Sequence, residues 1–230
     1  MIKLVRLSEN TIILLFEQKI SQENFTLIQH YVEKIRQNLK QYLIDIIPSY
    51  TSIHITFNVL TISGKGFQKR LTEIVTSYKD NDNAVAQKSG KTIHIPMYYG
   101  KEVALDMDLI AKNTSLTPEA IVALHANTTY TVYAIGFAPG FAYLGNVDQR
   151  IATPRKATPR KNIAPGSLGI ADEQTAIYPS ESPGGWQIIG RTPLQLIDYN
   201  SNNLTLFSTG DKVTFTPMSL SEYIEMGGVL

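Results

Sequence analysis

A short basic stretch of the sequence carries the residues best suited to binding an anion. Arg155 and Arg160 each follow a proline in a tandem Thr-Pro-Arg-Lys repeat, and no acidic residue lies between Asp148 and Asp172. A guanidinium presents a planar fork of donors that fits a carboxylate or a phosphate. Proline fixes φ just before each arginine, which a merely solvated loop does not require. The pattern therefore favours anion binding by these two arginines over a solvated basic loop.

Aromatic residues and glycines surround this basic stretch. The chain's only tryptophan follows two glycines in the segment Pro183-Gly-Gly-Trp-Gln-Ile-Ile-Gly-Arg-Thr-Pro193. Two adjacent glycines either let the backbone approach a ligand closely or simply form a tight turn. Aromatic side chains bury large areas, so they serve equally as barrel core or as the wall of a pocket. The candidate binding residues are Phe137, Phe141, Tyr178, Gly184, Gly185, Trp186 and Arg191.

His125 differs from the other three histidines because it lies next to this central stretch. It ends a helix that Thr117 caps, just before the apolar strand that begins at Tyr130. A histidine there either interacts with the negative end of the helix or supplies a polar group at the rim of a pocket. The residues alone leave both interpretations open.

Several common catalytic devices are missing from the sequence. The chain has no cysteine, so thiolate nucleophiles and Cys-ligated zinc are excluded. Ser89-Gly-Lys-Thr92 is not a phosphate loop, because Val85 stands where the leading glycine belongs and a strand pattern follows. Ser167 lies outside any Gly-x-Ser-x-Gly elbow. No two histidines have a metal-ligand spacing, so we expect neither a metal site nor a tightly bound cofactor.

Overall charge and hydropathy limit the partners of the protein. A net charge of +1, with a short basic stretch that lacks interleaved aromatics, gives no case for nucleic acid. No apolar run approaches the length of a membrane span, and Met1–Arg6 does not begin a signal peptide. We therefore expect a cytoplasmic protein without a membrane partner.

Hydrophobic periodicity divides the chain into two parts. Up to residue 98 the order of expected elements is ββαβαβ, with the last strand at residues 91–98. This order predicts a small α+β sandwich. Its long first helix has an apolar face from Phe25 to Leu39 and is expected to end at Pro48. After Tyr130, short strands separated by Gly and Pro predict a barrel or sandwich. The expected domains are residues 1–90 and 91–230, within an α+β fold class.

Several motifs in series resemble one known family, the B subunits of bacterial 5-oxoprolinase. That family also includes the sporulation-kinase inhibitor KipI and proteins labelled allophanate hydrolase subunit 1. The resemblance covers roughly the whole chain and is much weaker before Ile95. It implies a cyclophilin-like β-barrel for the second domain and a functional histidine at position 125. The matching segments are Gly136-Phe-Ala-Pro-Gly-Phe-Ala-Tyr-Leu144, the two Thr-Pro-Arg repeats, Pro165-Gly-Ser167, Ile177-Tyr-Pro179 and Pro183–Pro193.

The resemblance implies a protein that joins two other polypeptides in an ATP-dependent 5-oxoprolinase. That reaction opens 5-oxo-L-proline to L-glutamate, with ATP as co-substrate of the complex. Cations are needed for the phosphate and for the substrate carboxylate, and the basic stretch supplies them. We predict catalytic roles for His125, Arg155 and Arg160. We further expect these three residues and Arg191 to line one pocket that binds a small anion, and we expect the isolated chain to be inactive.

A regulatory role is the alternative from a different class. The KipI resemblance implies a protein that binds a sensor histidine kinase and blocks its autophosphorylation. The same aromatic and arginine side chains would then form a protein interface, where Trp, Tyr and Arg are favoured anchors. An allophanate hydrolase role would require an amidase partner with its own machinery. The genes that neighbour this one would discriminate between the enzyme and the regulator.

Overall fold

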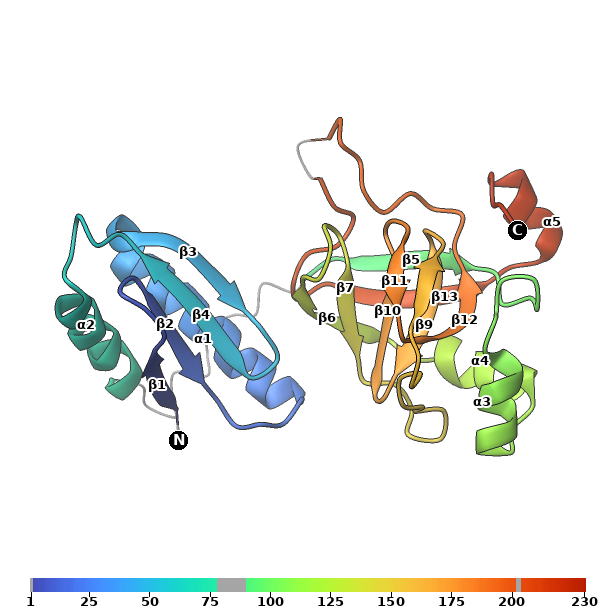
Figure 1. Ribbon diagram of the computed structural model, residues 1–230, viewed down its shortest axis with the longest axis horizontal. Coiled ribbons are helices and arrows are strands. Elements are labelled where there is room, and N and C mark those ends of the chain that lie inside the picture. Colours follow the sequence, from blue (N-terminus) through green and yellow to red (C-terminus); the bar gives the residue numbers. More distant parts are fainter. Residues whose placement is uncertain (1, 78–89, 202–203) are drawn as a thin grey trace. The chain divides into compact units, whose positions relative to one another are not determined.

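The chain folds into two compact units (Figure 1), Met1–Lys88 and Ser89–Leu230. The computed structural model describes residues 2–77, 90–201 and 204–230. The division falls close to the boundary expected at residue 90. Each unit has its own hydrophobic core, and together they give the α+β class that the sequence predicted.

The first unit is an antiparallel sheet covered by helices. The sheet order is β1-β2-β4-β3, and α1 crosses behind the sheet in Figure 1. Alternate residues of the central strands, such as Ile12, Leu14 and Ile55, are fully buried against the helices. The strands are β1 (Lys3–Arg6), β2 (Thr11–Leu15), β3 (Leu43–Pro48) and β4 (Ser52–Phe57).

The helices of this unit begin at side-chain caps. The Ser21 hydroxyl accepts a hydrogen bond from the Asn24 amide at the start of α1 (Gln22–Leu39), and Ser63 caps α2 (Gly64–Thr76) in the same way. The short 3₁₀ helix η1 (Lys40–Tyr42) follows α1. The expectation that the first helix continues to Pro48 is wrong, because β3 pairs with β4 there. A short apolar run does not distinguish helix from strand by periodicity. The apolar spacing after Gly66 predicts a second helix over residues 66–79, of which residues 78–79 lie outside the described residues.

The second unit is a nearly closed β-barrel with the strand order β12-β9-β10-β7-β6-β13-β5. The outermost strands meet at a bridge between Tyr98 and Arg191, whose two backbone hydrogen bonds measure 2.9 and 2.8 Å. A separate two-stranded sheet pairs β8 (Arg160–Ile163) with β11 (Ser182–Gly184). The barrel strands are β5 (Thr92–Met97), β6 (Tyr130–Ile135), β7 (Ala142–Gly145), β9 (Ser167–Ala171), β10 (Gln174–Ile177), β12 (Gln187–Arg191) and β13 (Lys212–Pro217).

The strand at residues 92–97 belongs to this barrel and not to an N-terminal sandwich. It pairs in parallel with β13, so its partner lies more than a hundred residues away in sequence, where local patterns carry no information. Between Tyr130 and Pro217 the described residues form no helix, which confirms the predicted change to short strands.

Three helices accompany the barrel: α3 (Met107–Thr114), α4 (Pro118–Ala126) and α5 (Leu220–Glu225). Thr117 caps α4 as predicted, since its hydroxyl accepts a hydrogen bond from the Ala120 amide. None of the helices in the described ranges combines the length and the apolar composition needed to span a bilayer.

Candidate functional site

Four aromatic side chains form a compact group on the second unit, the aromatic cluster. Phe141 lies at its centre, with ring centroids 4.9 Å from Tyr143, 5.3 Å from Tyr178 and 5.7 Å from Trp186. All three pairs are edge-to-face or nearly so, the geometry that the ring quadrupoles favour. Phe141, Tyr178 and Trp186 are buried, whereas Tyr143 is half-buried. The cluster therefore has one edge open to solvent, at Tyr143.

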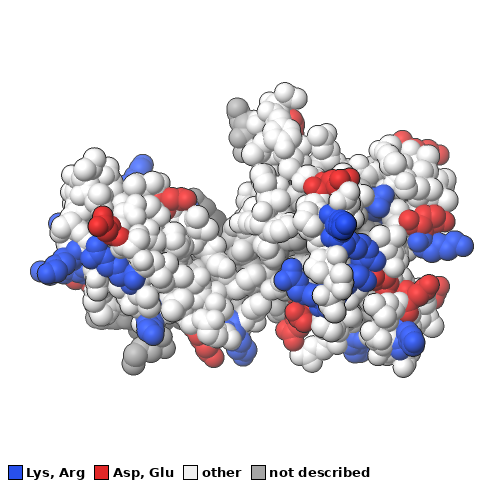
Figure 2. Space-filling view, viewed as in Figure 1, with Lys and Arg blue, Asp and Glu red and all other residues white. Residues whose placement is uncertain are grey.

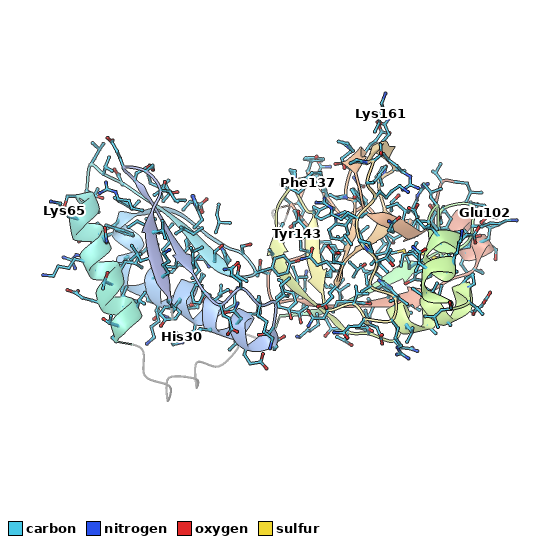
Figure 3. All side chains as sticks on the ribbon, turned by 60° about the horizontal axis from the view of Figure 1, so that its bottom comes forward. His30, Lys65, Glu102, Phe137, Tyr143 and Lys161 are labelled. Atoms are coloured by element: carbon cyan, nitrogen blue, oxygen red, sulfur yellow. The ribbon has the colours of Figure 1, made fainter. Side chains whose placement is uncertain are left out.

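Phe137 extends this cluster to the surface (Figure 3). Its ring packs edge-on against Phe141 at 5.3 Å, yet 64% of the residue is exposed. Its backbone φ of 70° lies in the left-handed region, which residues other than glycine rarely adopt. Strain of this kind concentrates at functional sites, because the surrounding structure must stabilise it. An exposed aromatic held in this way points to contact with a ligand or a partner.

The loop that contains the first Thr-Pro-Arg repeat is held against the cluster. The Lys156 amide donates to the Gly185 carbonyl at 2.7 Å, and the Gln187 side chain donates to the Pro154 carbonyl at 2.9 Å. The bonded residues Pro154 and Lys156 flank Arg155, and Gly185 and Gln187 flank Trp186. These two bonds therefore fix the backbone of Arg155 beside the aromatic cluster.

A buried carboxylate anchors the other basic residues of the loop. Asp106 precedes α3, and only 4% of it is exposed. Its oxygens accept hydrogen bonds from Lys156 Nζ at 2.9 Å and from both terminal nitrogens of Arg160 at 2.7 and 2.8 Å. The Ile188 amide donates to the same carboxylate at 2.7 Å. Four donors thus share two oxygens, and the guanidinium fork of Arg160 is engaged within the protein.

Electrostatics agree with an ionised Asp106. Burial would raise the pKa of this carboxyl, but the hydrogen bonds from Arg160, the Ile188 amide and Lys156 outweigh burial and hold the pKa below its usual value. Sequence reasoning missed Asp106. The available signal was the basic stretch itself, which has no acid nearby in sequence and must find its counter-charge elsewhere.

Arg155 is exposed and makes no hydrogen bond or ion pair with any described residue. Its charge nevertheless acts on the cluster. Burial raises the pKa of the Tyr143 and Tyr178 hydroxyls, and the positive charge of Arg155 offsets part of that rise in both. Arg160 has the same effect on Tyr178. The charges of both arginines therefore act on the Tyr178 hydroxyl. The fork of Arg160 is bound to Asp106, whereas that of Arg155 meets no acceptor among the described residues. Figure 2 shows Lys and Arg side chains gathered on the visible face of this unit.

His125 lies inside the barrel core and not at a rim. It is fully buried, with its ring nitrogens 3.0 Å from the Tyr99 hydroxyl and 3.1 Å from Thr175 Oγ1. Its ring also packs against Tyr130 and Phe215. Burial lowers the pKa of His125 to about 3, so the imidazole is neutral near pH 7. The helix end was predictable from sequence, but the direction in which the side chain points was not.

Arg191 has a separate partner. It ends β12, and its Nη1 donates to the Val229 carbonyl at 2.9 Å. No contact in the described residues joins Arg191 or His125 to Arg155. The expected convergence of all four groups on one pocket is therefore reduced to Arg155 and Arg160 beside Tyr178. Within the described residues, no group of three or more His, Asp or Glu side chains could hold a metal ion.

The two glycines before Trp186 have different environments. A Cβ added at Gly184 would collide with the Tyr178 hydroxyl and with Ile163, so this position permits the close approach of Tyr178. A Cβ at Gly185 would meet its nearest neighbours, Lys156 and Pro159, at 3.6 Å, which is ordinary contact. Gly184 is thus required by packing, and Gly185 is not.

Comparison with known proteins identifies the family. Residues 2–207 match the family model described as carboxyltransferase domain, subdomain C and D. The chain belongs to this family. Two curated relatives are named as the B subunit of 5-oxoprolinase. The Bacillus subtilis protein is 33% identical, with 95% of this chain and 93% of the relative covered. The Haemophilus influenzae protein is 39% identical over 76% of this chain and 80% of the relative.

Solved structures show the same fold, in some cases within longer chains. TTHA0988 is 27% identical with a TM-score of 0.77; 92% of this chain is covered, but this chain spans only 40% of that protein. PH0987 from Pyrococcus horikoshii is 33% identical with a TM-score of 0.57, with 96% of this chain and all of that chain covered. The urea amidolyase of K. lactis, at 18% identity and a TM-score of 0.80, shows only the shared fold; this chain spans 15% of it.

Replacing Gly184 with alanine should destabilise the second unit, whereas Gly185→Ala should leave it near wild type. The added methyl group at 184 displaces a buried tyrosine, and overpacking of this kind costs about 1–3 kcal/mol. Urea unfolding followed by Trp186 fluorescence measures both variants, since this is the only tryptophan. Equal stability of the two variants would contradict the packing role of Gly184.

Acid should destabilise the second unit through His125. The imidazole stays neutral in the folded state down to a pKa of about 3, whereas the unfolded chain binds its proton near pH 6.5. Stability should therefore fall as the pH drops from 6.5 towards 3, with a slope of about 1.4 kcal/mol per pH unit from this group.

His125→Gln should reduce that slope between pH 6 and pH 4 when unfolding is followed by Trp186 fluorescence. His94→Gln is the matched control, because His94 is an exposed histidine of the same unit. An unchanged slope in His125→Gln would refute the assignment of the acid sensitivity to this residue.

Proposed function

We propose that this protein is a subunit of an ATP-dependent 5-oxoprolinase and that it helps to open 5-oxo-L-proline to L-glutamate in a complex with partner subunits. The names of two relatives aligned over most of their length support the assignment. The observation that carries it is Arg155, a guanidinium without a protein partner in the described residues, fixed beside an aromatic cluster. We expect the complex to work in the cytoplasm.

The proposed site matches the two ends of the substrate. A carboxylate can accept two parallel hydrogen bonds from the fork of Arg155, and such charge-assisted bonds are about twice as strong as neutral ones. The flat ring of 5-oxo-L-proline fits against the open edge of the aromatic cluster at Tyr143 and against Phe137. Arg155 and the cluster thus bind and orient the substrate.

The remaining predicted residues take other places in the proposal. Arg160 positions the loop through Asp106, and His125 stays outside the site because both its ring nitrogens have partners in the core. Arg191 supports the closure of the barrel. The chain has no cysteine and no phosphate loop, so the partners must supply groups for the ATP-dependent step.

One observation favours a second candidate function. Phe137 is a strained, largely exposed aromatic that packs on the cluster, and Arg155 lies beside the cluster with no partner among the described residues. This combination suits a protein interface. A KipI-like inhibitor would use this surface to bind a sensor histidine kinase and block its autophosphorylation. Inhibition of kinase autophosphorylation by the purified chain, lost in Phe137→Ala, would favour this function over the enzyme.

Glutamate release should require the assembled complex. We expect ATP-dependent conversion of 5-oxo-L-proline when this chain is co-purified with the products of its neighbouring genes, and no turnover by this chain alone. A coupled assay for glutamate measures both preparations. Turnover by the isolated chain at the rate of the complex would contradict partner dependence. A stable complex that releases no glutamate would reject the proposed reaction.

Arg155→Ala should weaken binding of 5-oxo-L-proline by about 1.5–3 kcal/mol, the range for hydrogen bonds to charged groups. Arg150→Ala is the matched control, because Arg150 is an exposed arginine of the same region that pairs with Asp148 at 2.6 Å. Calorimetric titration gives both affinities, and melting temperatures verify the folds. Equal affinities in the two variants would leave Arg155 as solvated surface.

A further inference from the structure

We propose that Asp106 determines the charge class of the ligand, so that the Arg155 site selects a monoanion over a dianion. The inference rests on the proposed anion site and adds a residue that acts on specificity without touching the ligand. The relevant feature is that one buried carboxylate holds two of the neighbouring cations by hydrogen bonds.

Asp106 holds the ammonium of Lys156 and both terminal nitrogens of Arg160 by hydrogen bonds, which directs these groups away from a ligand. Oδ1 accepts from Lys156 and from Nη2 of Arg160, and Oδ2 accepts from Nη1 of Arg160 and from the Ile188 amide. About a quarter of each basic side chain remains exposed, 23% for Lys156 and 24% for Arg160, against 4% for Asp106. Breaking either ion pair would leave a buried carboxylate short of a donor, which is costly.

Arg155 is consequently the one cation beside the cluster whose hydrogen-bonding groups face no protein acceptor among the described residues. Lys161 lies on β8 and extends outward from the unit in Figure 3. One guanidinium matches the charge and the two oxygens of one carboxylate. A dianion needs a second cation. The nearest candidate is Arg160, which acts on the same Tyr178 hydroxyl as Arg155 but is held by Asp106.

Removing the charge of Asp106 should therefore change specificity and not merely stability. An asparagine at this position keeps the size of the side chain, but its amide carries no negative charge to hold the two cations. Arg160 and Lys156 would then become available to an anion beside Tyr178. A purely structural role predicts a lower melting temperature with the same preference between anions.

Calorimetric titration of the full chain tests this with two probes, 5-oxo-L-proline as monoanion and sulfate as permanent dianion. Wild type should bind 5-oxo-L-proline about tenfold more tightly than sulfate, and Asp106→Asn should gain about tenfold in sulfate affinity, the value of one charge-assisted hydrogen bond. Asp148→Asn is the matched control: it removes the same charge from an exposed pair with Arg150 and should leave the preference unchanged.

The outcomes separate the inference from the proposed function. Wild type that binds neither probe removes the anion site and the inference with it. Wild type that binds 5-oxo-L-proline, with Asp106→Asn folded and showing the same preference, leaves the site intact and overturns the role of Asp106. A gain of sulfate affinity equal in Asp106→Asn and Asp148→Asn would reduce the effect to overall charge and also overturn it.

A second variant tests the same point without disturbing Asp106. Lys156→Gln removes a cation that is already engaged, while Arg160 and the Ile188 amide still satisfy the carboxylate. Its affinity for 5-oxo-L-proline should stay within about threefold of wild type, whereas Arg155→Ala should lose about tenfold or more, by the energy of a charged hydrogen bond. A loss in Lys156→Gln as large as that in Arg155→Ala would show that Lys156 contacts the ligand and would overturn the inference.

Discussion

A single buried carboxylate organises the surface on which the proposed function depends. Transfer of Asp106 out of water is unfavourable, and only the four donors around it make its ionised form stable there. Those donors come from the loop of the Thr-Pro-Arg repeats and from β12. In return, the Asp106 amide donates to the Ile188 carbonyl at 2.9 Å, so the start of α3 is fixed to the same strand. One charge therefore connects a helix, a loop and the barrel.

The loop that Asp106 anchors also contacts the aromatic cluster. Loop contacts to Gly185 and Gln187 place Arg155 beside Trp186, and the absence of a side chain at Gly184 lets Tyr178 approach. The cluster is rigid because its inner rings are buried and packed edge-on. In the proposed site, a rigid apolar wall lies beside Arg155, whose fork has no partner among the described residues. The surface is partly pre-organised, since the arginine side chain, but not the wall, must be ordered when a ligand arrives.

The family assignment gives this surface a chemical context without supplying the whole reaction. The chain matches subdomains C and D of a carboxyltransferase domain, and some structural relatives contain the same fold as a minor part of much longer chains. The proposed site, which would bind and orient a small acid, fits a reaction shared among several polypeptides. The strained and exposed Phe137 at the edge of the site is where ligand binding and partner binding would meet.

Local features of this protein were readable from the order of its amino acids. Pattern and propensity were sufficient to predict features that depend on neighbours within a few residues. Examples are the helix cap at Thr117, the change to short strands after Tyr130 and the family motifs. Which groups meet was decided by the packing of distant segments. Asp106 lies 50 and 54 positions from the cations that it binds, and β5 pairs with a strand about 120 positions away. The His125 side chain points into the core, and the Arg160 side chain binds a carboxylate. Neither was predictable locally, because burial and charge pairing are determined only when distant segments pack together.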